Sequence, residues 1–217
     1  MGINKKIKLA LLTLAAACAT AASAAPLTGA VSSAGTLCLN PGSTTQPGAP
    51  CTTVDVSTLR YLDFLDGGLT ASPGTPGRLL FLTASGDLTP TIGQSGAIYD
   101  FPLPGPGDSL ATFSGVDPLW TVTGTDGSLY SYVLSSLIGV DRSVPNAIDV
   151  RGTGTLCRDG VDCNLFSFIF TTQNAQGSTR TTFSLSQSGF AEVPEPGSLG
   201  LLGLGLAGLV WRVRRRA

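Results

Sequence analysis

A chain of 217 residues has room for one well-filled domain and short targeting segments. It contains no histidine, which excludes Ser-His-Asp and Cys-His catalysis and histidine-ligated metal sites. Residues 25–196 contain 14 acidic residues against six arginines and no lysine, a net charge of −8, which argues against nucleic-acid binding because phosphate contacts need clustered cations. Charged residues make up only 12% of the chain, beside 28 glycines and 14 prolines, a composition typical of a turn-rich, exported β-protein.

Residues 1–24 have the organisation of a signal peptide. Three lysines within residues 1–8 precede an apolar run over residues 9–17, and Ala22-Ser23-Ala24 fits the small-x-small pattern that signal peptidase cleaves. We therefore expect export by the Sec machinery and cleavage after Ala24. The alternative is a lipoprotein, because the residues before Cys18 form a degenerate lipobox.

Residues 25–191 form the expected β-rich extracytoplasmic domain. Its first part, residues 27–51, is rich in Gly, Pro, Ser and Thr and predicts a loop. Beyond it, short apolar or alternating runs predict about nine strands. They include residues 61–65, 78–84, 120–123, 130–137, 147–151, 153–157, 165–173 and 179–188. This pattern indicates an all-β fold, a single antiparallel β-sandwich or jelly-roll-like domain.

The last two predicted strands show the clearest alternation. One strand carries a stripe of three phenylalanines on one face, namely Phe166, Phe168 and Phe170. The next strand places Phe183 and Leu185 on one face and hydroxyl residues on the other, and residues 174–177 join the two strands as a hairpin loop. We interpret the stripe as the buried face of a sheet, and a ligand platform is the alternative.

Four cysteines remain after removal of the signal peptide, an even number that predicts disulfides in an exported chain. Of the three possible pairings, Cys38–Cys51 and Cys157–Cys163 need the least chain closure, and we expect these two. Neither pair has the Cys-x-x-Cys spacing of a zinc site, so we expect no metal ligands among them.

Aspartates gather in turn-like stretches at residues 63–66, 126–127 and 159–162. Paired carboxylates can serve glycoside hydrolysis or bind calcium. However, none of these stretches matches an EF-hand or a nonapeptide calcium repeat, and aspartate before glycine is ordinary turn chemistry. No serine lies in a Gly-x-Ser-x-Gly elbow. We therefore predict no catalytic residue, no cofactor and no metal, which makes the protein a non-enzyme.

Residues 192–217 contain three parts in a fixed order. Val193-Pro194-Glu195-Pro196 is non-helical because two prolines restrict the backbone. Residues 199–211 are uncharged and apolar and predict a transmembrane helix. The basic cluster that follows comprises Arg212, Arg214, Arg215 and Arg216. The positive-inside rule keeps these arginines in the cytoplasm and the body outside it. An ordinary single-span protein that is never processed is the alternative.

This tripartite end resembles the PEP-CTERM sorting signal of Gram-negative, exopolysaccharide-producing bacteria. The resemblance implies that exosortase, a membrane enzyme, recognises Pro194, Glu195 and Pro196 and cleaves at or near them. Before cleavage, the helix would anchor the chain in the inner membrane, with the arginines as its cytoplasmic retention cluster. Afterwards the protein would pass to the cell surface or the extracellular matrix. The body resembles uncharacterised proteins of this group over residues 61–65, 85–88, 119–123 and 166–185, which implies no known activity.

Three functions follow from these observations. The first is a structural surface or matrix protein associated with exopolysaccharide or biofilm. The second is a carbohydrate-binding module that uses exposed aromatic residues, the candidates being Tyr61, Tyr99, Trp120 and Tyr130. Burial of these side chains would favour the structural role over the binding role. The third is an aspartate-based glycoside hydrolase, which needs two carboxylates that converge in a cleft.

Overall fold

The computed structural model describes residues 26–40, 56, 59–65, 76–144, 147–173 and 181–189. Over these residues the chain forms ten β-strands and two longer 3₁₀ segments, η2 and η3. The strands are β1 (Ala30–Asn40), β2 (Tyr61–Phe64), β3 (Gly77–Ala84), β4 (Ser95–Ile98), β5 (Phe101–Pro102), β6 (Val116–Thr123), β7 (Leu129–Asp141), β8 (Asp149–Arg158), β9 (Asp162–Gln173) and β10 (Thr181–Gly189). The 3₁₀ segments are η2 (Gly86–Thr91) and η3 (Leu110–Thr112).

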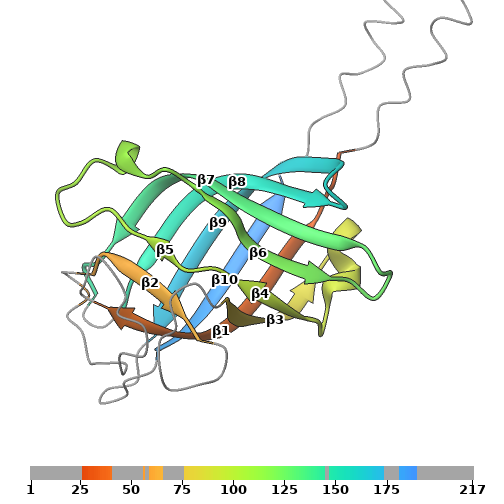
Figure 1. Ribbon diagram of the computed structural model, residues 1–217, viewed down its shortest axis with the longest axis horizontal. Helices are drawn as coiled ribbons and strands as arrows, with labels where there is room; N and C mark the ends of the chain where they lie inside the picture. The colour runs from red at the N-terminus through yellow and green to blue at the C-terminus, as the bar shows by residue number, and fades with distance from the viewer. Residues whose placement is uncertain are drawn as a thin grey trace, which may run out of the picture.

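Eight of the strands close into an antiparallel barrel (Figure 1). Their order is β1-β3-β4-β6-β7-β8-β9-β10, and β10 pairs back onto β1 from Ala30↔Ser188 to Leu37↔Thr181. The all-β prediction is confirmed, whereas the predicted sandwich or jelly roll is wrong. The reason is that β1 pairs with β3 on one edge and β10 on the other, so the first and last strands remove each other's free edge.

The strand β1 lies in the stretch predicted to be a loop. Its inward positions include Val31, Ser33 and Leu37, all buried, and Gly35 lies under the ring of Phe183. A Cβ at Gly35 would lie 2.7 Å from that ring, so the small residue makes room for the aromatic one. Pairing on both edges therefore overrides the weak intrinsic strand preference of glycine and serine.

The strand β8 runs without a break through Gly152, where the sequence predicted two separate strands. Gly152 and Gly154 both face the barrel interior and are buried. A Cβ at Gly154 would lie 2.6 Å from the hydroxyl oxygen of Tyr132. Glycine here marks the close approach of β7, through a backbone carbonyl as well as a side chain, and does not end the strand.

Aromatic side chains fill much of the barrel interior. A continuous series of ring contacts links Phe81, Trp120, Tyr132, Phe168, Phe170, Phe183, Phe64, Phe101 and Phe113. Trp120 and Tyr132 stack with their ring centroids 5.9 Å apart, and Tyr132 stacks on Phe168 at 6.1 Å. The stripe of three phenylalanines on β9 is buried, as predicted, and belongs to this core.

Side chains in the turn after β3 bind the residues at and just before the start of β1. Asp87, in η2, accepts hydrogen bonds from the amide and the hydroxyl of Thr28 at 2.8 and 2.9 Å. Ser85 accepts a hydrogen bond from the Ala30 amide at 3.0 Å. The Thr28 amide holds the pKa of the Asp87 carboxyl below its usual range, so this contact is made to an ionised group.

The strands β2 and β5 extend the sheet beyond the barrel (Figure 1). The strand β2 pairs with the end of β1, and β5 pairs with β2. Leu62, Phe64 and Phe101 turn towards the common core, where each is buried. Alternation along the strands then places Asp63 and Asp100 on the opposite face.

No helix in the described ranges is long and apolar enough to cross a membrane. The predicted signal peptide (residues 1–24), hairpin loop (174–177), sorting element (193–196), membrane helix (199–211) and arginine cluster (212–216) lie outside these ranges.

Candidate functional sites

The predicted disulfide between Cys157 and Cys163 is present and joins β8 to β9. Beside it, the Arg158 guanidinium contacts the Asp162 carboxylate at 2.6 Å, so two cross-links hold the same hairpin end. Cys38 is also disulfide-bonded. Cys51, its predicted partner, lies outside the described residues.

The candidate carbohydrate-binding aromatics do not form an exposed row. Trp120 and Tyr130 are fully buried, and Tyr61 and Tyr99 are half-buried. Trp120 points into the barrel, where its indole N–H donates to the side-chain oxygen of Gln187 at 3.1 Å. Two of the four side chains are therefore core residues, which favours the structural role over the binding role.

Two of the aspartate-rich stretches serve as turns. Asp126 accepts hydrogen bonds from the Ser128 amide at 3.0 Å and from the Tyr130 hydroxyl at 3.2 Å. Asp159 accepts from the Leu129 amide at 2.8 Å. These carboxylates hold the hairpin ends of β6–β7 and β8–β9, which is the ordinary turn chemistry expected from Asp-Gly.

The third stretch has a different environment, because Asp63 lies beside Asp100. Tyr61 pairs with Pro102 and Leu62 with Phe101, so the next step of this register sets Asp63 next to Asp100. The Phe64 amide donates to Oδ1 of Asp100 at 2.8 Å, which ties the two strands together there. Sequence reasoning proposed the pair Asp63 and Asp66, and Asp66 lies outside the described residues.

The sequence carries no local signal for Asp100, because only the β2–β5 register brings it to Asp63. Asp63 is 0% exposed, and neither of its carboxylate oxygens has a hydrogen-bond partner. The second oxygen of Asp100, Oδ2, is also buried without a partner.

The environment of this pair favours the protonated form of each carboxyl group. Burial raises the pKa of Asp63 to about 6. Burial also raises the pKa of Asp100 to about 7, where the neighbouring Asp63 adds to the rise and the Phe64 amide opposes it.

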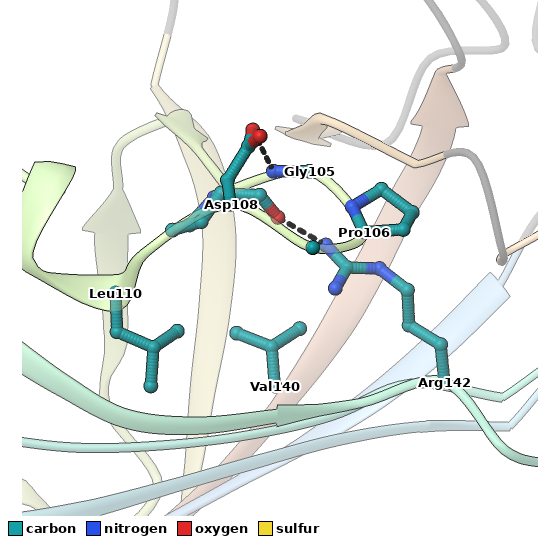
Figure 2. A pocket seen from close by; sticks show the side chains of 8 residues that line it. Gly105, Pro106, Asp108, Leu110, Val140 and Arg142 are labelled. Atoms are coloured by element: carbon teal, nitrogen blue, oxygen red, sulfur yellow. Dashed lines mark hydrogen bonds between the residues drawn. The ribbon is translucent and has the colours of Figure 1, made fainter.

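A shallow pocket of about 260 Å³ lies between the loop 104–108 and the end of β7 (Figure 2). Asp108 accepts hydrogen bonds from the Gly105 amide and the Arg60 guanidinium, both at 2.8 Å. Arg142 donates to the backbone carbonyls of Leu59 at 3.0 Å and Pro104 at 2.6 Å. Burial, together with the nearby Arg60, lowers the pKa of Arg142. Arg142 therefore ties the loop to the end of β7, and Asp108 ties it to Arg60.

The comparison with known protein families concerns the C-terminal part of the chain. Residues 192–216 match the family described as the PEP-CTERM protein-sorting motif. The chain carries a PEP-CTERM signal. No curated protein and no solved structure matches the chain.

The PEP-CTERM match covers the element Val193–Pro196 and the arginines from Arg212 to Arg216. It supports export, transit through a membrane-anchored form and sorting by exosortase. The signal-peptidase site at Ala22 and Ala24, the roles of the individual sorting residues and the boundaries between the three segments stay predictions.

Proposed function

We propose that this protein is a non-enzymatic structural protein of the cell surface or extracellular matrix, associated with exopolysaccharide or biofilm. The observation that carries the proposal is the PEP-CTERM match over residues 192–216. In this proposal, Sec exports the chain, the inner membrane holds it through its C-terminal helix, and exosortase releases the barrel from that anchor.

The contacts that the aromatic and aspartate side chains make within the barrel support a structural role. Its large aromatic residues pack against one another in the core, and its turn aspartates bind backbone amides. A glycoside hydrolase needs its two carboxylates in a cleft, whereas Asp63, the better-placed candidate, is fully buried.

The outer surface supports contact with polysaccharide. Hydroxyl side chains pair across neighbouring strands, as Ser167 does with Ser188 at 2.8 Å and Ser32 with Thr83 at 2.7 Å. Ser136 and Thr153 form a third such pair at 2.8 Å between β7 and β8. Hydroxyl groups can exchange hydrogen bonds with sugar hydroxyls, and the lysine-free body lacks the cations that would draw it to nucleic acid instead.

The test compares wild type with Glu195→Ala in a host that carries exosortase and in one that lacks it. We expect wild type to lose its C-terminal segment only where exosortase is present. Glu195→Ala should be exported but remain as a longer, membrane-bound form in both hosts. Glu192→Ala is the matched control, because it removes a neighbouring acidic residue outside Pro194-Glu195-Pro196 and should be processed like wild type.

Size on denaturing gels, fractionation and mass spectrometry provide the measurements. Equal loss of the segment in both hosts, or its retention in both, would contradict exosortase sorting. The matrix role has a separate measurement, co-sedimentation of the processed protein with exopolysaccharide from its host, and a protein that stays in the supernatant contradicts that role alone.

A further inference from the structure

The pocket between the loop 104–108 and the end of β7 contains an arginine without a carboxylate partner (Figure 2). Arg142 is half-buried, and its hydrogen bonds to the backbone carbonyls of Leu59 and Pro104 both use Nη2. Its Nε is buried without a partner, and its Nη1 makes no hydrogen bond among the described residues. The ion pairs of the described chain join other arginines to aspartates, namely Arg60 to Asp108, Arg151 to Asp149 and Arg158 to Asp162. The charge of Arg142 is therefore partly removed from water and is not balanced by an anion.

The charged groups at this pocket leave a surplus of one positive charge. Asp108 also lines the pocket, but its Oδ2 accepts hydrogen bonds from the Arg60 guanidinium and the Gly105 amide. Asp108 and Arg60 balance each other, and Arg142 remains. Asp141, the preceding residue in the chain, lies outside the lining of this pocket. Burial and the nearby Arg60 lower the pKa of Arg142 more than Asp108 raises it, so a bound anion would stabilise the charged form of Arg142.

Aliphatic side chains form the other walls of the pocket. Figure 2 shows Arg142 on one side and Leu110 on the other, with Val140 between them. Leu110 and Val140 also pack against the barrel core, which fixes their positions. The volume of about 260 Å³ is below the roughly 300 Å³ at which pockets for drug-sized ligands begin. The lining therefore suits a small anionic group that also presents an apolar face.

We propose that this pocket binds the carboxylate of an acidic sugar unit, a uronic acid residue within a polysaccharide. Arg142 would donate from Nη1 to the carboxylate, and Leu110 and Val140 would contact the C–H face of the sugar ring. One carboxylate matches the surplus of one positive charge, whereas a phosphate group carries up to two negative charges and would leave one unbalanced. This inference rests on the proposed association with polysaccharide and specifies an acidic one.

The experiment uses the exported protein, purified with its disulfides intact. Oligogalacturonate is titrated by calorimetry, beside a neutral maltooligosaccharide of the same length, sodium acetate and sodium phosphate. We expect oligogalacturonate to bind, more weakly as salt is added, and the other three probes to bind at least roughly tenfold more weakly. Arg142→Gln should weaken binding by roughly tenfold or more, because it removes the charged donor. Leu110→Asp should weaken it similarly by charge repulsion, while leaving Arg142 and its contacts with the loop in place.

The matched control is Arg78→Gln, because Arg78 is exposed on β3 and does not line the pocket, and this variant should bind like wild type. Thermal unfolding verifies that the variants remain folded, and Leu110→Asp decides the question if Arg142→Gln does not fold. Absence of binding to wild type at millimolar oligogalacturonate would overturn the inference. So would equal binding of the neutral oligosaccharide, or pocket variants that bind as tightly as wild type.

Two comparisons separate this inference from simpler alternatives. Acetate or phosphate that binds as tightly as oligogalacturonate would overturn recognition of a sugar, since the pocket would then hold any small anion. Co-sedimentation with exopolysaccharide from the host tests the proposed function independently. A protein that co-sediments but does not bind oligogalacturonate contradicts the role of the pocket alone. A protein that binds oligogalacturonate through Arg142 but does not co-sediment contradicts the matrix role alone.

Discussion

Trp120 and Gln187 form a polar contact inside the barrel. The indole N–H of Trp120 on β6 donates to Gln187 on β10 at 3.1 Å, and Gln187 is 2% exposed. Because this hydrogen bond spans the interior, it gives two non-neighbouring strands a defined relative position. The side-chain amide nitrogen of Gln187 is buried without a hydrogen-bond partner, so this side chain satisfies the indole N–H while one of its own polar groups stays unpaired.

We predict that Gln187→Leu lowers the free energy of unfolding by about 1–3 kcal/mol, because the buried Trp120 N–H loses its acceptor. Chemical denaturation monitored by tryptophan fluorescence measures the change. Ser186→Ala, at the exposed neighbouring position on β10, is the control and should stay within about 0.5 kcal/mol of wild type. Equal stability of Gln187→Leu and wild type would show that the indole hydrogen bond adds nothing.

Asp63 and Asp100 predict an unusual pH dependence of the free energy of unfolding. The folded state raises their pKa values to about 6 and about 7, so it binds protons more tightly than the unfolded chain does. Stability should therefore rise as the pH falls from 8 to 5, by on the order of 2 kcal/mol. The absence of histidine removes the usual side chains that titrate in this window.

Thermal unfolding at several pH values tests this dependence. Asp100→Asn should make the profile between pH 5 and 8 less steep, because it removes the group with the higher pKa, and the remaining slope should come from Asp63, whose pKa burial raises. Below about pH 4 stability should fall again, since the pKa values of Asp87 and Asp108 are held low by hydrogen bonds in the folded state. A wild-type profile that is flat, or that rises towards pH 8, contradicts the prediction.

Among the strands, β7 and β8 show how glycine positions are used. Gly154 on β8 lies under the ring of Tyr132, whereas Gly139 on β7 faces open space. Both positions pair within the same two strands, as Gly154 with Leu134 and Gly139 with Arg151. The two glycines therefore differ chiefly in the space that is available for an added side chain.

We predict that Gly154→Ala destabilises the barrel by about 1–3 kcal/mol, because the added methyl group would clash with the backbone carbonyl oxygen of Val133 and with the hydroxyl end of Tyr132. Gly139→Ala is the matched control and should be neutral or slightly stabilising, since its Cβ meets no atom within 4 Å. Denaturant unfolding of the two variants side by side gives the comparison. Equal effects would show that the packing of Tyr132 does not depend on Gly154.

For the chain as a whole, the closed barrel joins the first strand to the last. Because β1 follows the predicted cleavage site by a few residues and β10 precedes the sorting signal, both processing sites flank a barrel that closes on itself. Loss of both end segments should therefore leave the paired edges of β1 and β10 intact.

We predict that the mature protein begins at Ala25 and ends at or near Pro194-Glu195-Pro196. Mass spectrometry of protein from the native host, with peptide mapping under non-reducing conditions, determines both ends and the partner of Cys38. The map should join Cys38 to Cys51. An N-terminus at a lipid-modified Cys18 would move the protein to the lipoproteins, and free thiols would contradict the predicted disulfide.

Local patterns were sufficient for the features that depend on neighbouring residues. Short apolar or alternating runs and turn signals predicted β3, β6, β7, β9 and β10. The order of prolines, apolar residues and arginines indicated the sorting signal that the family comparison finds. The pairing of Cys157 with Cys163 was equally local, because only the five residues 158–162 separate them.

Long-range pairing was needed for the rest. A strand of small residues such as β1 has little apolar content of its own, and β3 and β10, which pair along its two edges, are far away in sequence. Barrel and sandwich share the same alternation, so only the pairing of β1 with β10 separates them. For the same reason Asp100 could not be found from the sequence. No motif surrounds it, and only the register of β2 and β5 places it beside Asp63.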